Sequence, residues 1–223
     1  MQIRNKLQQE TSKIFKWRGH SDTETLLAAF EYWGISKTLK ACEGMFSIAL
    51  WNRKERLLTL ARDRFGEKPL YYGWSNGAFI FGSELKALKV FPGFDSTLNK
   101  TALSLLFRYA YVPAPHSIYE NIYKLPQGSF VVFTAKKNGS RKLNIKQEND
   151  IKYYWSLEQE VRQAQTNIFK GSFEQAVTQT EAMLSQSVQM QMLSDVPIGS
   201  FLSGGIDSSL VTALITSGPV INI

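Results

Sequence analysis

The chain has 223 residues and a formal net charge of +7, and its content of 43% hydrophobic and 13% aromatic residues suits a packed core and excludes a disordered tail. No apolar run is long enough to cross a bilayer, and the polar start does not resemble a secretory signal, so we expect no membrane-spanning segment. The single cysteine, Cys42, excludes an internal disulfide framework and is typical of a reducing compartment, so we expect a cytoplasmic protein.

Two helices are predicted at the start of the chain. Residues 2–14 carry apolar side chains at helical spacing, although no capping residue or strand precedes them. A second helix is predicted over residues 21–34. Ser21 would cap it, Glu24 would complete a capping box, and Gly34 would end it.

A run of short strands follows, joined by polar turns that indicate antiparallel pairing. The predicted strands cover residues 44–51, 57–62, 70–74 and 79–83, with a further hairpin formed by residues 128–135 and 141–146. Between them, Ser83 and Asn99 would cap two short helices, and the prolines of "YVPAP" would end the second. We therefore predict one layered α+β unit over residues 1–150.

The densest basic stretch covers residues 136–152. It contains an Asn-Gly turn signal and is interrupted by Glu148 and Asp150, which favours a solvated hairpin tip and linker. A nucleic-acid surface is the alternative, but no base-stacking motif is interleaved with the charges, so nucleic acid is not the expected partner.

A second domain is predicted to begin after a linker over residues 151–171. Ser172 and Gln175 form a second capping box at the start of a helix. Residues 196–203, "VPIGSFLS", are nearly all apolar, which predicts a strand buried on both faces, as in a parallel sheet covered by helices. Residues 172–223 therefore read as the opening of an α/β domain.

The segment "SGGIDSS", residues 203–209, lies between this predicted strand and a predicted helix. Its glycines allow a sharp turn and close approach of a ligand, and amides at a helix start favour an anion. Asp207 repels bare phosphate, so its natural partner is a bound Mg²⁺. A plain glycine turn that caps a helix is the alternative reading. There is no Gly-Lys-Ser/Thr, which excludes the usual kinase-type phosphate loop.

The motif "SGGIDSS" resembles the pyrophosphate loop of the ATP pyrophosphatase superfamily, and "LSDVPIGSFLSGGIDSSLV" resembles the glutamine-hydrolysing asparagine synthetases. The segments "GHSDTETLL", "GMFSIALWN", "ARDRFGEKPLYY" and "YVPAPHSIYENIYKLPQGSF" resemble the glutaminase domain of the same family, in its order. The resemblance implies a partial four-layer αββα glutaminase of the N-terminal nucleophile hydrolase type over residues 1–150. The start of an α/β ATP-pyrophosphatase domain would then cover residues 172–223.

The resemblance also implies roles for particular residues. Asp22 would bind the α-ammonium group of glutamine, although a plain first-turn acid is the alternative. Met45 would line an ammonia tunnel or be a core methionine, and the charged loop over residues 62–68 would either shape the site or be a salt-linked turn. ATP and Mg²⁺ would bind the pyrophosphate loop. Its expected ATP-binding residues are Leu202, Ser203, Gly204, Gly205, Asp207, Ser208 and Ser209, with Asp207 also meeting the metal.

The sequence departs from the family at the nucleophile. The family uses a cysteine that becomes the first residue, whereas here Met1 is followed by Gln2, so no catalytic residue is assigned. Cys42 has no α-amine and precedes a predicted core strand, where burial would leave it inert. From this departure, and from the position of the pyrophosphate loop close to the last residue, we expect a chain truncated at both ends.

The function implied is that of a glutamine-hydrolysing asparagine synthase. Ammonia from glutamine would amidate an ATP-activated aspartate β-carboxylate and give asparagine, AMP and pyrophosphate, while this chain alone would be inactive. One alternative is an amidotransferase of the same family that acts on another carboxylate, such as a surface-polysaccharide sugar acid. A non-catalytic ATP-binding module is a second. A homodimer is left open.

Overall fold

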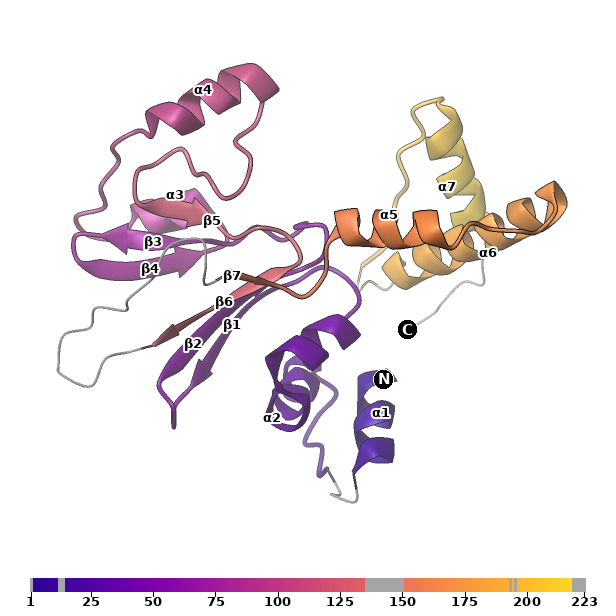
Figure 1. Cartoon of the computed structure of the whole chain (residues 1–223), viewed down its shortest axis with the longest axis horizontal. Helices are drawn as coiled ribbons and strands as arrows, with labels where there is room; N and C mark the ends of the chain where they lie inside the picture. The colour runs from indigo at the N-terminus through magenta and orange to yellow at the C-terminus, as the bar shows by residue number, and fades with distance from the viewer. Residues whose placement is uncertain (1, 12–14, 135–150, 193, 195, 218–223) are drawn as a thin grey trace. The chain divides into compact units, whose positions relative to one another are not determined.

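The computed structural model describes residues 2–11, 15–134, 151–192, 194 and 196–217, and Figure 1 shows its helices and strands. The chain divides into two compact units, Met1–Gln159 and Glu160–Ile223. Among the described residues, no helix is both long enough and apolar enough to cross a membrane.

Two helices open the first unit. Helix α1 spans Gln2–Glu10 and buries Leu7, as its spacing predicts. Helix α2 spans Asp22–Ala41 and is interrupted at Gly34, whose φ of 76° lies outside the helical region. Gly34 therefore ends the first helical segment as predicted, but a second segment resumes directly after it.

Within the described residues, seven strands form two antiparallel sheets. The first sheet has the order β1-β2-β6-β7, and the second has the order β4-β3-β5. The strands of the first sheet are β1 (Ser47–Asn52), β2 (Leu57–Arg62), β6 (Ser129–Thr134) and β7 (Ile151–Tyr153). Those of the second are β3 (Tyr71–Ser75), β4 (Ala78–Gly82) and β5 (Ile122–Lys124). The five predicted strands that fall in the described residues are thus confirmed with small shifts of their ends, whereas residues 141–146 lie outside the described part.

The main core lies between the two sheets. Leu58 and Leu60 of β2 and Phe133 of β6 pack against Tyr72 of β3, and the Phe79 ring of β4 lies 4.6 Å from that of Phe133. Alternate residues of a strand point to opposite faces, so this set leaves the other face of the first sheet for a second cluster. There, Ala61 and Phe130 pack against Leu39 of α2.

Two short helices belong to the same unit. Helix α3 spans Leu85–Lys89 and contacts β4, while α4 spans Lys100–Tyr109. Asn99 caps α4 as predicted, since its side chain accepts a 2.9 Å hydrogen bond from the amide of Ala102. The predicted cap Ser83 is wrong, because α3 begins one residue later, after Glu84, and no side chain caps it.

The fold class of this unit is therefore α+β with two antiparallel sheets. One sheet is covered by α2 on one face and by the other sheet on the opposite face. The complete four-layer arrangement stays a prediction.

The segment that we expected to be a linker carries regular structure. Strand β7 pairs with β6 and so extends the first sheet beyond residue 150. Helix α5 (Leu157–Thr166) follows it. Sequence reasoning missed both, although Leu157, Val161 and Ala164 repeat at helical spacing within α5.

Helices make up the regular structure described in the second unit. Helix α6 spans Phe173–Gln191 and α7 spans Ile206–Ser217. The predicted capping box of Ser172 and Gln175 is confirmed by hydrogen bonds of 3.3 and 2.9 Å between each side chain and the other's amide.

The buried strand predicted over residues 196–203 is wrong. The described residues of this segment adopt no strand, and the side chain of Phe201 is 97% exposed. A strand needs a neighbour for its backbone hydrogen bonds, and no other strand is described in this unit. An apolar run alone therefore does not place these residues in a sheet.

Candidate functional site

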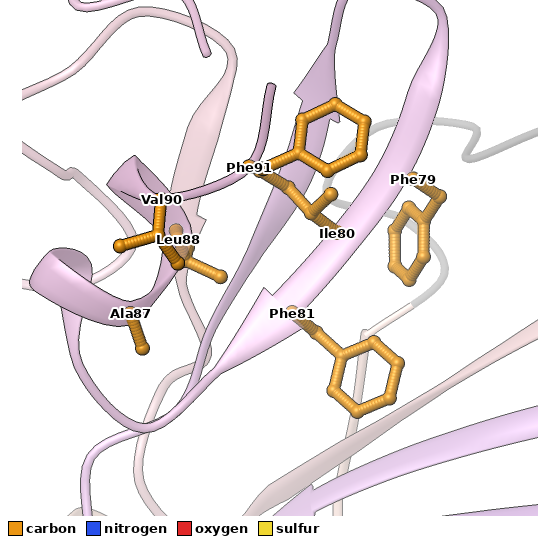
Figure 2. A pocket seen from close by; sticks show the side chains of 7 residues that line it. All are labelled: Phe79, Ile80, Phe81, Ala87, Leu88, Val90 and Phe91. Atoms are coloured by element: carbon orange, nitrogen blue, oxygen red, sulfur yellow. The ribbon is translucent and has the colours of Figure 1, made fainter. Parts of the chain in front are cut away.

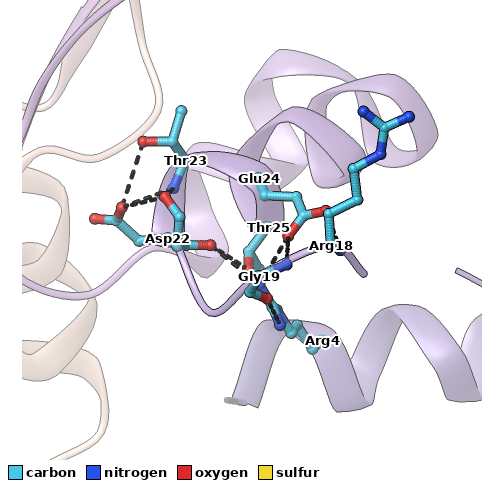
Figure 3. Close-up of polar contacts among 8 residues, drawn as sticks. Arg4, Arg18, Gly19, Asp22, Thr23, Glu24 and Thr25 are labelled. Carbon is cyan, nitrogen blue, oxygen red and sulfur yellow. Dashed lines mark hydrogen bonds and ion pairs between the residues drawn. The ribbon is translucent and has the colours of Figure 1, made fainter. Parts of the chain in front are cut away.

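Asp22, the predicted glutamine-binding residue, lies exposed at the first position of α2 (Figure 3). Its Oδ1 accepts hydrogen bonds from the amide of Thr23 at 2.7 Å and from the hydroxyls of Thr23 and Ser21 at 3.4 and 3.5 Å. Among the described residues, no group donates to its Oδ2. The geometry leaves one carboxylate oxygen facing solvent and able to accept from a cationic ligand.

The capping box predicted for the start of α2 is wrong for Glu24 and correct for Ser21. Ser21 does cap α2, because its hydroxyl accepts from the amide of Thr23 at 3.1 Å. The carboxylate of Glu24 instead accepts from the amides of Arg18 and Gly19, at 2.8 and 3.1 Å. Glu24 therefore binds the loop that precedes α2 and does not cap the helix.

Arg4 of α1 holds the same loop from the other side (Figure 3). Its guanidinium donates to the carbonyls of Gly19 and Ser21 at 2.8 and 3.1 Å, to the Thr25 hydroxyl at 2.7 Å, and to Glu24 at 3.4 Å. Sequence reasoning missed Arg4, because neither its spacing nor its neighbours link residue 4 to residues 19–25.

Cys42 does not form a nucleophilic site. Its side chain is 5% exposed, and burial raises the pKa of the thiol to about 11. The thiol therefore stays protonated at neutral pH, and a thiol rather than a thiolate is a poor nucleophile. This agrees with the expectation that Cys42 cannot replace a terminal cysteine.

The charged loop after β2 is organised around a buried carboxylate. Asp63 is almost fully buried, and its two oxygens accept from the amides of Phe46, Phe65, Glu67 and Lys68 at 2.9 to 3.3 Å. These bonds fold residues 63–68 tightly around one side chain. Sequence reasoning noted the alternating charges here but did not single out Asp63, since an aspartate in a glycine-containing loop is usually exposed.

The arginines on either side of Asp63 also bond to backbone. Arg62 donates to the carbonyls of Lys68 at 3.0 Å and of Leu125 at 2.7 Å, and it also donates to that of Gly66. Arg64 donates to the carbonyls of Lys40 and Cys42 at the end of α2. The loop is therefore held by side-chain to backbone bonds, rather than by the salt links among its own charges that one reading expected.

Met45 is 53% exposed, so the prediction of a core methionine is wrong for it. It precedes β1, at the surface of the first unit. An exposed thioether is compatible with lining a passage, but the tunnel role stays a prediction.

A cavity of about 390 Å³ lies beside β4 and α3 (Figure 2). Apolar side chains line it, among them Phe81, Leu88 and Val90. It presents no ionisable side chain, so it offers no group for acid–base or nucleophilic chemistry.

The predicted pyrophosphate loop leads directly into α7. Gly204 adopts a φ of +83°, which favours glycine, and the loop turns there into the helix. The hydroxyls of Ser208 and Ser209 donate to the carbonyl of Gly205 at 3.0 and 2.8 Å, and Ser203 lies 3.0 Å from Ser208, oxygen to oxygen. The structure thus brings together the glycines and serines that the sequence assigned to phosphate binding.

Asp207 lies exposed in the first turn of α7. No group of three or more histidine, cysteine, aspartate or glutamate side chains in the described ranges could hold a metal by itself. A carboxylate of this kind can bind Mg²⁺ together with phosphate oxygens, which is how magnesium is usually held beside nucleotides. That Asp207 meets Mg²⁺ stays a prediction.

Comparison with known proteins agrees with this order of elements. Residues 1–144 match the family described as "Glutamine amidotransferase domain", and residues 179–218 match "Asparagine synthase". Two proteins of Bacillus subtilis, named asparagine synthetase (glutamine-hydrolyzing) 3 and 1, are 33% and 34% identical to the chain. The matched regions cover 92% and 91% of this chain and 31% and 29% of those proteins.

The chain belongs to the glutamine-hydrolysing asparagine synthetase family. It spans about a third of the length of the curated relatives that it matches. A more distant relative, amidase chyE of Penicillium rubens, is 27% identical over 90% of this chain and 27% of that protein.

Proposed function

We propose that the chain supplies the glutamine-recognition unit and the opening of the ATP unit of an asparagine synthase. The observation that carries the proposal is the order of two features in one chain. An amidotransferase match over residues 1–144 precedes a "SGGIDSS" loop that lies inside the second family match and turns into α7. A protein that both takes ammonia from glutamine and activates a carboxylate with ATP needs these two parts together.

The two units would divide the work. Residues 1–150 would form the glutaminase-type domain, residues 151–171 would connect it, and residues 172–223 would begin the ATP-pyrophosphatase domain. Because β7 (Ile151–Tyr153) completes the edge of the first sheet, we place the end of the glutaminase-type domain a few residues later than the sequence suggested.

Each site would act through its own residues. The free Oδ2 of Asp22 would accept from the α-ammonium group of glutamine and orient it. The amides at the start of α7 and the serine hydroxyls of the loop would hold the pyrophosphate of ATP, and Leu202 would contact the base through its backbone. Asp207 would meet Mg²⁺. When bound, ATP supplies the adenylate that activates the aspartate β-carboxylate for ammonia.

The 223 residues alone would not hydrolyse glutamine. The one cysteine of these residues, Cys42, is buried and protonated at neutral pH, so it would not serve as the nucleophile. Glutamate released from glutamine above the blank, and lost in Cys42→Ala, would contradict this.

A second candidate is an amidotransferase of the same family that acts on another carboxylate, such as a sugar acid. The similarity to the protein named amidase chyE, 27% identical over 90% of this chain, supports keeping this candidate. A non-catalytic ATP-binding module is a third candidate. It predicts Mg·ATP binding with no product under any condition.

Complementation tests the proposal. The gene that encodes this chain, with its native flanking sequence, would be introduced into an asparagine auxotroph. We expect growth without asparagine, and loss of growth with Asp207→Ala. With Asp22→Ala we expect growth to depend on added ammonium, because only the glutamine site is damaged. No growth on either nitrogen source, together with normal expression, would contradict an asparagine synthase.

A further inference from the structure

Arg4 donates from all three nitrogens of its guanidinium group to the loop before α2 and to the first turn of α2. Nε donates to Thr25, one terminal nitrogen donates to the carbonyl of Gly19, and the other donates to the carbonyl of Ser21 and to Glu24. The guanidinium also lies 4.4 Å from the centre of the Trp17 ring. Its side chain is only 18% exposed, so these contacts hold it in one place.

Glu24 completes the arrangement from the other direction. Its carboxylate accepts from the amides of Arg18 and Gly19 and pairs with Arg4. These backbone amides, first that of Arg18, hold the pKa of Glu24 below its ordinary value. Arg4 of α1 and Glu24 of α2 therefore hold two carbonyls and two amides of the loop over residues 18–21.

The bond from Arg4 to Ser21 bears directly on Asp22. The carbonyl of Ser21 and the amide of Asp22 belong to the same planar peptide unit. Arg4 shares that carbonyl with the amide and hydroxyl of Thr25, which donate to it at 3.4 and 3.2 Å. Together these bonds fix the plane from which the Cα of Asp22 departs, and so limit the directions in which its carboxylate can point. Figure 3 shows Arg4 and Asp22 on opposite sides of this short segment.

We propose that Arg4 is a positioning residue for glutamine recognition, which sets the direction in which the free Oδ2 of Asp22 meets the α-ammonium group. This inference rests on the proposed role of Asp22. It requires arginine rather than lysine, because a planar guanidinium can donate to several fixed acceptors at once, whereas an ammonium group acts as a point charge.

The test compares two ligands on the 223-residue chain. L-Glutamine and 4-carbamoylbutanoate, which lacks the α-amine, are titrated in the millimolar range and followed by backbone amide NMR. The variants are Arg4→Lys, Arg4→Ala, the reference Asp22→Asn, and the control Lys6→Ala, which removes an exposed charge from the same helix. Hydrogen exchange of the Arg18 and Gly19 amides reports the loop independently of either ligand.

We expect the wild-type chain to prefer glutamine over the analogue. Arg4→Lys should lower that preference by about tenfold, as expected for one weakened charge-assisted hydrogen bond. It should leave affinity for the analogue unchanged, and the Gly19 amide should exchange faster. Lys6→Ala should change neither. Because Arg4→Lys keeps the charge and most of the side chain, it serves even where Arg4→Ala fails to fold.

Two results would overturn the inference. One would exclude the role of Arg4 alone, and the other would exclude the role of Asp22 as well. An unchanged preference in Arg4→Lys, while Asp22→Asn abolishes it, would show that Arg4 does not position Asp22. A wild-type chain that binds glutamine no better than the analogue, with the Gly19 amide still protected, would remove the role of Asp22 itself and the inference with it.

Discussion

The hydroxyl of Tyr154 donates a 2.9 Å hydrogen bond to the main-chain carbonyl of Arg62, across 92 positions of sequence. Tyr154 is buried, and burial raises the pKa of its phenol. It directly follows β7, while Arg62 is the last residue of β2. The bond therefore ties the segment that leaves the first sheet to the strand at its centre.

Tyr154→Phe should destabilise the first unit by about 1 kcal/mol, because it removes one donor from a buried carbonyl while it keeps the packing of the ring. Urea unfolding followed by tryptophan fluorescence would measure the change. The control is Tyr153→Phe, since Tyr153 is exposed and its hydroxyl should contribute little. Equal stability of both variants would show that the bond to Arg62 contributes nothing.

Asp63 should be the more costly residue to lose. Asp63→Ala leaves the four amides that its carboxylate accepts from without their acceptor, and we expect a loss of about 3 kcal/mol or more. Asp63→Asn keeps one acceptor oxygen and should lose less. Glu67→Gln, an exposed neighbour, is the control, and all three are compared by urea unfolding. If Asp63→Ala lost no more stability than Glu67→Gln, the loop would not depend on this side chain.

The buried thiol of Cys42 predicts both slow alkylation and a pH dependence. A pKa raised from 9.0 to about 11 lowers the thiolate fraction at pH 8 about 100-fold, so iodoacetamide should react about 100-fold more slowly than with an unfolded chain. Mass spectrometry of native and urea-unfolded samples would measure the rates.

The raised pKa of Cys42 also predicts that the folded chain loses stability as the pH rises from 9 to 11. The neutral thiol is favoured in the folded state, so its contribution to stability is complete below pH 9 and is lost as the pH rises towards 11. Comparing the stability of wild type and Cys42→Ser across this range isolates the effect of Cys42. A native alkylation rate equal to the unfolded one would contradict the burial on which both predictions rest.

Sequence patterns predicted the parts of the fold that local chemistry determines. Strand β2 and the Asn99 cap were predicted correctly, because an apolar segment between polar turns and a side-chain helix cap are both short-range signals. Strands β5 and β7 have three residues each and exist only through pairing with β3 and β6, which no local pattern reveals. The strand predicted over residues 196–203 was wrong for the converse reason, since the described part of the second unit offers this apolar run no strand to pair with.

The candidate site residues likewise fall into those that local sequence predicts and those that depend on distant contacts. The loop over residues 203–209 could be read from its glycines and serines, which need no distant partner. Arg4 and Glu24 could not, because what matters is their contact with a loop at residues 18–21, and that contact depends on how α1 packs beside α2. Asp63 could not be singled out from the sequence, because its carboxylate accepts from backbone amides, and no side-chain pattern marks which amides lie near it.

If residues 203–209 bind pyrophosphate as proposed, substitutions at Gly204 and Gly205 should affect folding and ATP binding separately. A methyl group on Gly205 would lie 3.7 Å from the Ser203 hydroxyl, an ordinary contact, so Gly205→Ala should fold normally. It should nevertheless lower Mg·ATP affinity, by about tenfold, because phosphate must approach the backbone closely there.

Gly204→Ala should lose about 1 kcal/mol of stability instead, since Gly204 has a φ of +83°. Asp207→Asn should weaken ATP binding only when Mg²⁺ is present. Isothermal titration with and without Mg²⁺ measures the affinities. Equal affinity in wild type, Gly205→Ala and Asp207→Asn would remove this loop from nucleotide binding.

Transfer of the glutamine amide nitrogen tests the central claim most directly. Protein expressed from the gene with its native flanking sequence would be incubated with amide-¹⁵N glutamine, aspartate, Mg²⁺ and ATP, and the products analysed by mass spectrometry. We predict ¹⁵N-labelled asparagine with one AMP formed for each asparagine, and no labelled product when ATP is omitted. Hydrolysis of ATP without labelled asparagine, or label on a different acid when a mixture of carboxylates is supplied, would contradict an asparagine synthase.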